Sequence, residues 1–366
     1  MSAPAVAGSA ELTKLHTELA RRLIPFARSD RARAGICLTP ARALGYATAH
    51  ICLQRLGYRD VEFDLLLSRS LAGSAARSGE AAPHRQLELD WLRTLADGSE
   101  NESQGADSLA AHSILAQPVD LLSAGRSDMY AFTHALMFLT GFGVTLDCLP
   151  RPEQCLALEA EGLLAAALDD QDYDVAAELL LTWPLLSLDW SPAATFAFSV
   201  LTHVEDRAGF LPSPMTRVDR YEALAPEERP RYALATAYHG VFTMGLLCAL
   251  SLHPGPPPAA DLMAGDDGAE GPAAAILDLL DRDERRSHWR ECVASSSCVP
   301  DSIASILLTM LLRRAAARMD MRLVNAGVKI ADRHGLGGLN SAVQARELLS
   351  RVAALDPNLD SHLSRR

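Results

Sequence analysis

The sequence is short of several features that would indicate a particular class of protein. Aromatic residues make up only 5% of its 366 residues, and 34 basic residues stand against 46 acidic ones, which gives a formal charge of −12. Affinity for nucleic acid depends on a basic surface, so this charge argues against a nucleic-acid partner. A small molecule, or a peptide of basic charge, is the better expectation.

Long apolar runs and paired cysteines are also missing. The longest apolar run, residues 302–312, is shorter than the roughly 18 residues of a membrane span. The N-terminus has no basic region followed by a continuous apolar stretch, so we expect a cytoplasmic protein with no membrane partner. None of the seven cysteines forms a CxxC pair, which argues against a disulfide framework or a four-thiolate zinc site.

No motif for a nucleotide cofactor is present either. The glycine-rich "HGLGGLN" (334–340) follows a helical pattern, whereas a dinucleotide or phosphate loop follows a strand. The segment "DDQDYD" (169–174) is only poorly similar to the magnesium-binding segment of class I terpene synthases, because a second metal motif is not apparent. Asp172 and Asp174 are better interpreted as residues of the first turn of the next helix.

What the sequence has in abundance is helical periodicity. Apolar residues recur at intervals of three and four, whereas sustained alternation is hard to find. The clearest examples are residues 11–27, 85–96, 155–168, 174–183 and 345–355. The pattern predicts an all-α fold, arranged as antiparallel helical hairpins in a helical repeat or an α/α-toroid. The sequence does not decide the oligomeric state, and a homo-oligomer stays an alternative.

The loops suggest a division of the chain. We expect a disordered N-terminus at 1–9, a main helical domain at 10–252 and a C-terminal helical subdomain at 273–366. Between the last two, residues 253–272 are rich in Pro, Gly and Asp and predict a linker or a lid.

A degenerate motif recurs along the chain, in which a histidine is followed by a glycine six or seven positions later. Its copies begin at His50, His134, His203 and His239. In each copy the glycine is interpreted as a left-handed C-cap that ends a helix. The repetition favours equivalent helix ends that gather on one face of a helical array.

Three of these histidines are candidate site residues. His134, in "YAFTHALMFLTGFG", and His239, in "LATAYHGVFTMGLL", lie in apolar helices and are interpreted either as core residues or as part of a ligand pocket. His203 precedes Glu205 and Asp206, an arrangement that suits a divalent metal or an oriented general base. His84 and Glu88 form a further pair at i and i+4, which is also common on exposed helix faces.

The segments "DMYAFTHALMFLTGFG", "EDRAGFLP" and "YHGVFTMGLL" resemble those of an uncharacterised family of all-helical actinobacterial proteins that is associated with biosynthetic gene clusters. The resemblance covers about residues 10–250 and implies a role in specialised metabolism. It carries no reaction over to this chain.

Two hypotheses follow. The first is an enzyme that modifies a small molecule or a peptide. In its metal version, iron, copper or zinc is held by His134, His203 and His239 with Glu205 or Asp206. In its metal-free version, a histidine such as His134 moves protons, with Asp128 near it, and Tyr130 or Tyr238 orients the substrate. The second hypothesis is a non-catalytic helical-repeat module that binds a peptide or a carrier protein.

Overall fold

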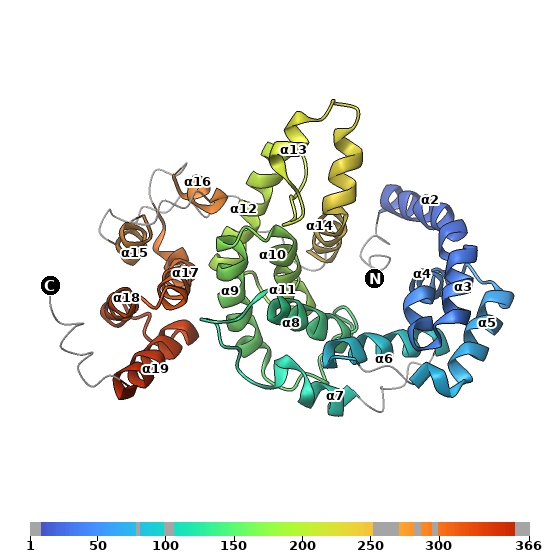
Figure 1. The fold of residues 1–366 in the computed structure, drawn as a ribbon, viewed down its shortest axis with the longest axis horizontal. Coiled ribbons are helices and arrows are strands. Elements are labelled where there is room, and N and C mark those ends of the chain that lie inside the picture. The colour runs from blue at the N-terminus through green and yellow to red at the C-terminus, as the bar shows by residue number, and fades with distance from the viewer. Residues whose placement is uncertain are drawn as a thin grey trace. The chain divides into compact units, whose positions relative to one another are not determined.

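The computed structural model describes residues 9–77, 81–98, 106–251, 271–281, 287–294 and 299–355. Throughout these ranges the regular secondary structure is helical and contains no strand, so the all-α prediction is confirmed (Figure 1). The chain divides into two compact units. Unit 1 comprises Met1–Ala116 and His134–Pro150, and unit 2 comprises Gln117–Thr133 and Arg151–Arg366.

Unit 1 is built from short helices around a small aliphatic core. Its helices are α2 (Ala10–Ala27), α3 (Asp30–Leu38), α4 (Ala43–Arg55), α5 (Val61–Ala72), α6 (Pro83–Asp97), α7 (Ala106–His112) and the C-terminal part of α8 (Arg126–Leu139), with 3₁₀ turns at Pro40–Arg42, Ser74–Arg77 and Ile114–Ala116. Ile36, Leu44, Ile51, Phe63 and Leu92 pack together in the core of α3 to α6.

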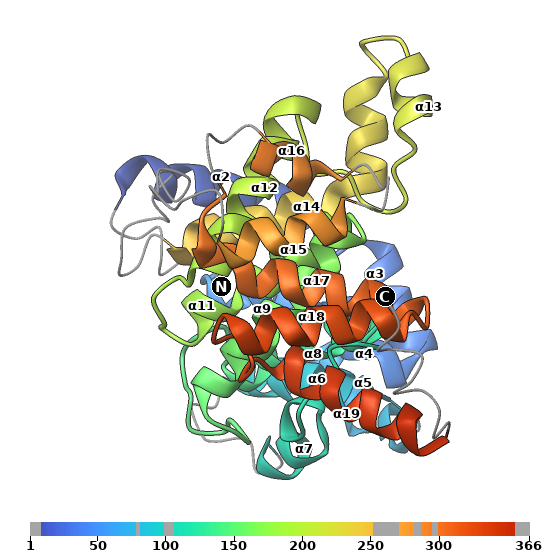
Figure 2. The same ribbon diagram turned by 90° about the vertical axis from the view of Figure 1, so that its left-hand side faces the viewer.

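Unit 2 holds the larger core. Its helices are α9 (Glu153–Asp169), α10 (Tyr173–Leu180), α11 (Thr182–Leu185), α12 (Pro192–Ala208), α13 (Val218–Ala223), α14 (Arg229–Ser251), α15 (Pro272–Leu280), α16 (His288–Ala294), α17 (Ala304–Ala317), α18 (Met321–Arg333) and α19 (Asn340–Leu355), with a 3₁₀ turn at Asp301–Ile303. Helices α9, α10 and α17 are buried along most of their length. Figure 2 shows α17, α18 and α19 in succession, and each packs against the next.

Two helix starts of unit 2 are capped by side chains of the local sequence. Asp172 is the N-cap of α10, and its carboxylate accepts a hydrogen bond from the amide of Val175 at 3.4 Å. Ser191 caps α12 in the same way through the amide of Ala194, and Pro192 occupies the first turn. Both positions are thus explained by local sequence, because a side-chain oxygen satisfies an amide that has no partner within the helix.

The glycines of the recurring motif behave as predicted in three copies of four. Gly57, Gly141 and Gly209 have φ values of +90°, +53° and +78°, just beyond the ends of α4, α8 and α12. Left-handed backbone at these points is favoured by glycine. For Gly245 the prediction is wrong: this residue lies inside α14, which continues to Ser251.

The expected linker at 253–272 lies almost entirely outside the described residues, as do residues 1–8 of the expected N-terminal segment. Helices on both sides of the expected linker, α14 and α15, belong to unit 2. The boundary between the two compact units falls within α8, after Thr133, and the expected division at 253–272 stays a prediction.

Candidate functional site

The strongest concentration of buried charge in unit 2 begins on α10. Asp174 and Glu178 are one helical turn apart, so their side chains lie on the same face of the helix. Both are buried, and only 2% of the Glu178 side chain is exposed. A buried carboxylate must be paired or hydrogen-bonded, because its removal from water is costly. The partners of these two carboxylates therefore define the candidate site.

Helix α14 supplies one partner at a break in its own backbone. Ala237 has φ −130° and ψ 17°, which are not helical values, and it is buried. Just before this break, the carbonyl of Thr236 accepts a hydrogen bond from the Ser213 hydroxyl at 2.6 Å. The helix resumes at Tyr238 and His239. The Ser213 hydroxyl thus takes up a backbone carbonyl next to the kink, and insertion of a side chain into the hydrogen-bond ladder of a helix is a recognised cause of helix bending.

His239 faces both carboxylates of α10. Its Nδ1 lies 2.7 Å from Oδ1 of Asp174, and its Nε2 lies 3.4 Å from Oε1 of Glu178. An ionised carboxylate only accepts hydrogen bonds, so Nδ1 carries the proton and donates it to Asp174. About 40% of the His239 side chain remains exposed. The imidazole is thus oriented from inside the protein and accessible from outside.

The pKa of His239 is raised above its ordinary value. The hydrogen bond with Asp174 is the largest cause, and the charges of Asp174 and Glu178 act in the same direction, while burial and Arg126 oppose them. Each of these carboxylates favours the positively charged imidazolium. The site therefore holds a proton more tightly than an isolated histidine does.

Two residues of α8 complete the network. Arg126 donates from Nε to Oδ2 of Asp172 at 2.6 Å and from a terminal nitrogen to Oδ2 of Asp174 at 3.2 Å. Thr133, which is buried, donates its hydroxyl to Oε2 of Glu178 at 2.6 Å. Asp172 and Asp174 thus face the guanidinium of Arg126, and Asp174 and Glu178 face the imidazole of His239, which raises the affinity of the imidazole for its proton.

The expected partners of His203 are not the ones that the structure gives it. Its Nε2 lies 3.4 Å from Oε2 of Glu291 on α16, and Arg207 also pairs with that carboxylate. The nearer acids in sequence, Glu205 and Asp206, are exposed on α12. His203 therefore ties α12 to α16 in a contact that is half open to solvent.

A second histidine of α16 is fixed by α10. Nδ1 of His288 lies 2.5 Å from the hydroxyl of Tyr173. Burial lowers the pKa of His288 and raises the pKa of Tyr173. Both groups are therefore uncharged near neutral pH, and this pair is a neutral contact rather than an ion pair.

His134 lies in the part of α8 that belongs to unit 1. Its ring is buried and makes edge contacts with the rings of His84 and Phe138, at centroid distances of 6.1 Å and 5.7 Å. Burial is the largest cause that lowers the pKa of His84, and Arg85 and His134 add to it. His134 is thus one ring of an aromatic contact in unit 1, and Glu88 pairs with Arg85 at 2.6 Å.

Asp128 and Tyr130 have local roles in α8. The Asp128 carboxylate accepts a hydrogen bond from the amide of Gly125 at 2.8 Å, which satisfies a backbone donor at the start of the helix. The carbonyl of Tyr130 accepts a hydrogen bond from Thr133 at 3.2 Å. Tyr238, in contrast, is 53% exposed and lies beside His239, with ring centroids 6.4 Å apart.

Metal ligation was the other expectation for the histidines. Among the residues that the structure describes, no three or more His, Cys, Asp or Glu side chains are grouped so that they could hold a metal ion. His239 and its two carboxylates are already committed to one another and to Arg126 and Thr133. Iron, copper or zinc at His134, His203 and His239 stays a prediction.

Sequence reasoning missed Arg126, Thr133 and Glu178, and it assigned Asp174 only a role in the first helical turn. A signal was present, because "YDVAAELL" places two acids four residues apart in an otherwise apolar helix. A helix that is apolar on every side is buried, so acids within it require partners from elsewhere in the chain.

By length and composition, α14 is apolar enough to cross a membrane, with a mean hydropathy of 1.5 over its most apolar window. In the structure 28% of that window is buried. One such helix among the described residues is weak evidence, because core helices of other proteins meet the same criterion. The expected absence of a membrane partner stays a prediction.

Fold and site together define an all-α protein that presents a carboxylate-bound histidine at its surface. Residues 4–249 match a family described as a domain of unknown function, DUF6895, and the chain belongs to this family. No curated protein and no solved structure matches the chain. The link to actinobacterial biosynthetic clusters stays a prediction from the sequence.

Proposed function

We propose that the protein is an enzyme that modifies a small molecule or a peptide, and that His239 transfers a proton to or from the substrate. The observation that carries the proposal is the 2.7 Å contact between Asp174 and Nδ1 of a half-exposed imidazole. A carboxylate at Nδ1 fixes the ring orientation and leaves Nε2 as the atom that exchanges a proton with substrate. This corresponds to the metal-free version of the first hypothesis.

The surroundings favour a substrate with an apolar part and a positive charge. Tyr238 and Phe242 are exposed on the same helix as His239, and they offer aromatic surface to an apolar group. The local excess of carboxylates and the net charge of −12 favour a cation. A role in specialised metabolism and a cytoplasmic location are part of the proposal, and they depend on the sequence alone.

The test screens a pool of compounds for any that the protein converts. The wild-type protein is incubated in D₂O with a pool of amine-containing metabolites and short basic peptides, and mass spectrometry records compounds that are consumed or that gain deuterium. We expect His239→Gln to reduce any such conversion about 100-fold or more, the ordinary contribution of a general acid or base.

His203→Gln is the matched control, because it removes a half-exposed histidine of the same unit that contacts a carboxylate outside the proposed site. It is expected to retain the wild-type rate. A conversion that proceeds equally well in His239→Gln would contradict the proposal. The metal version is checked separately: about one equivalent of iron, copper or zinc in the purified protein, lost in His239→Gln, would favour it.

A second candidate function is a binding module for a peptide or carrier protein, favoured by the exposed apolar face of α14. Leu234, Tyr238, Val241 and Phe242 all lie on this face with their side chains exposed. Such a face is a common docking surface for an amphipathic partner helix. For a labelled peptide rich in leucine and lysine, this alternative predicts that a Leu234→Ala, Phe242→Ala double variant weakens binding and that His239→Gln does not.

A further inference from the structure

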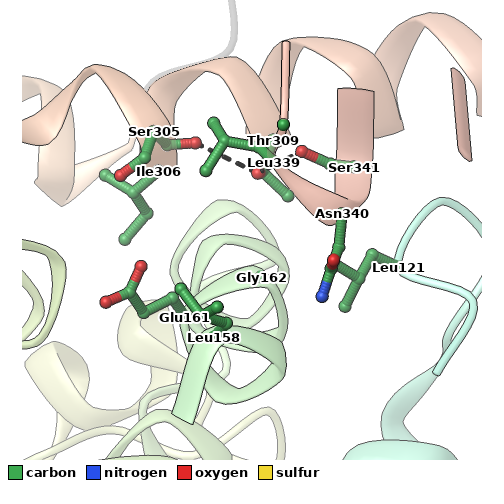
Figure 3. Close-up of a pocket in the computed structure, with 11 residues that line it drawn as sticks. Leu121, Leu158, Glu161, Gly162, Ser305, Ile306, Thr309, Leu339, Asn340 and Ser341 are labelled. Atoms are coloured by element: carbon green, nitrogen blue, oxygen red, sulfur yellow. Dashed lines mark hydrogen bonds between the residues drawn. The ribbon is translucent and has the colours of Figure 1, made fainter. Parts of the chain in front are cut away.

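A pocket lies within unit 2, and it shares no residue with the His239 site. It encloses about 410 Å³, including its open mouth, between α9, α17 and the N-terminal end of α19 (Figure 3). Its apolar walls are formed by Leu121, Leu158, Ile306 and Leu339. Glu161 is the charged group of its lining.

The pocket walls are held by hydrogen bonds across unit 2. The Thr309 hydroxyl bonds to the Ser341 hydroxyl at 2.8 Å and donates to the carbonyl of Ser305 at 3.0 Å, which joins α17 to the start of α19. The amide of Leu121 donates to the side chain of Gln344 at 2.8 Å. The elements around the pocket are therefore tied to one another, and the hollow between them is part of the packed structure.

Glu161 is partly buried at one side of this pocket. In Figure 3 its carboxylate lies below Ser305 and Ile306, and the Asn340 side chain lies on the opposite side of the space. Burial raises the pKa of Glu161 above its ordinary value, and a hydrogen bond with Ser191 opposes this effect. Because burial disfavours the ionised form of Glu161, a cation that entered the pocket would stabilise the ionised carboxylate.

The other polar groups of the pocket lining narrow the chemical class of the ligand. The Thr309 and Ser341 hydroxyls are engaged with each other, whereas the Ser305 hydroxyl and the Asn340 side-chain amide line the space near the apolar walls. One carboxylate at one side of a mostly aliphatic cavity suits a molecule with a single positive end and a short hydrocarbon body. A phosphate or a carboxylate ligand would be repelled by Glu161.

We infer that this pocket is a binding site for a primary ammonium compound with a short alkyl chain, in which Glu161 pairs with the ammonium and the alkyl chain lies against Leu121, Leu158, Ile306 and Leu339. The inference does not depend on the proposed catalytic role of His239. A substrate amine or a regulatory amine would use the same chemistry.

The test uses two probes of nearly equal shape, n-pentylammonium and n-pentanol. The protein is labelled with ¹³C at isoleucine δ1 methyl groups, and Ile306→Val assigns the signal of the pocket. We expect n-pentylammonium to shift the Ile306 signal in a saturable way, and n-pentanol to bind about tenfold more weakly or worse, because it cannot pair with the carboxylate.

Glu161→Gln keeps the shape of the side chain and removes its charge. We expect this variant to bind n-pentylammonium only as weakly as the wild type binds n-pentanol. Glu222→Gln makes the same charge change at an exposed position of α13 and is expected to bind as the wild type does. The inference would be overturned if the wild type bound the two probes with equal affinity, or if Glu161→Gln bound n-pentylammonium as tightly as the wild type does. It would also be overturned if millimolar n-pentylammonium caused no saturable shift of the Ile306 signal.

Because the wild-type comparison of the two probes requires no variant, it holds even if Glu161→Gln folds poorly. Failure of this site would leave the His239 proposal intact, because conversion in D₂O is measured with different variants.

Discussion

Each unit contains one histidine bound to an aspartate at 2.7 Å, and the two pairs differ in almost every other respect. In unit 1, His50 is 0% exposed, donates from Nε2 to Asp64 and accepts at Nδ1 from Nε of Arg28 at 3.2 Å. In unit 2, His239 donates from Nδ1 to Asp174 and is 40% exposed.

The neutral forms of the two histidines are therefore opposite tautomers, with the proton on Nε2 in His50 and on Nδ1 in His239. Arg28 can only donate, so Nδ1 of His50 has no proton, and both ring nitrogens are used inside the protein. His239 donates from Nδ1 to Asp174, its Nε2 lies 3.4 Å from Oε1 of Glu178, and about 40% of its side chain is exposed. A histidine–carboxylate contact alone does not indicate function; the exposure of the imidazole to solvent separates the structural pair at His50 from the proton-transfer candidate at His239.

The largest expected effect is on stability in unit 1. His50→Ala removes a buried ring that packs on Phe63, with centroids 4.2 Å apart, and it removes the imidazole acceptor of Arg28 Nε. We expect a loss of about 3 kcal/mol in the free energy of unfolding, the usual result when a buried polar partner is removed. Urea unfolding measures it, with hydrogen exchange assigning the loss to unit 1.

His239→Ala is the matched comparison and should cost no more than about 1 kcal/mol, because its ion pair is partly screened by solvent. If the two variants lost equal stability, the contrast between a structural and a surface histidine would fail.

A somewhat smaller effect is expected at Thr133. Thr133→Val keeps the side-chain shape but removes the hydrogen bond to the buried Glu178 carboxylate. Hydrogen bonds to charged groups contribute more than neutral ones, so we expect a loss of about 2 kcal/mol in urea unfolding. Thr202→Val serves as the control, because that hydroxyl bonds only to the carbonyl of Phe198 in its own helix. Similar losses in both variants would show that Glu178 does not need Thr133.

The His239 pair should also make the stability of the protein depend on pH. Because the pKa of His239 is raised in the folded protein, its charge stabilises the fold below the unfolded value of about 6.5. That stabilisation is lost as the pH rises through the folded pKa. The unfolding free energy of the wild type, compared with His239→Gln, should therefore show an advantage near pH 6 that declines above neutrality.

Asp174→Asn removes the largest cause of the raised pKa, so most of this pH dependence should disappear in that variant. An advantage that instead grows as the pH rises would mean that the His239 pKa is lowered by folding.

The smallest effect is expected at Gly240, which packs against the site. A Cβ there would lie 3.7 Å from Oδ1 of Asp174, an ordinary contact distance. Gly240→Ala should therefore leave the His239 titration unchanged and stabilise α14 by up to about 1 kcal/mol, since alanine favours a helix over glycine. Thermal unfolding and NMR titration would measure both. A displaced titration would show that the Asp174 contact has less room than the structure indicates.

Local features of the sequence predicted much of the fold but little of the site. Asp172, Ser191 and the glycines at 57, 141 and 209 act through neighbours in the chain, so their roles can be derived from short segments. The prediction for Gly245 is wrong because α14 continues past this residue to Ser251, and a helix interior tolerates a single glycine at a cost of about 1 kcal/mol relative to alanine.

The site contacts join residues far apart in sequence, which periodicity does not pair. His239 meets Asp174 across 65 positions, and His203 meets Glu291 across 88, although Glu205 and Asp206 are its near neighbours. Sequence proximity suggested those neighbours as partners, whereas the contact with Glu291 joins two separate helices and has no local signal.

The most direct test of the central claim is a ¹⁵N NMR titration of the His239 ring, assigned with His239→Gln. The account predicts a pKa above 6.5 and, at higher pH, a neutral ring with its proton on Nδ1. A pKa below 6.5, or a neutral ring protonated at Nε2, would contradict it.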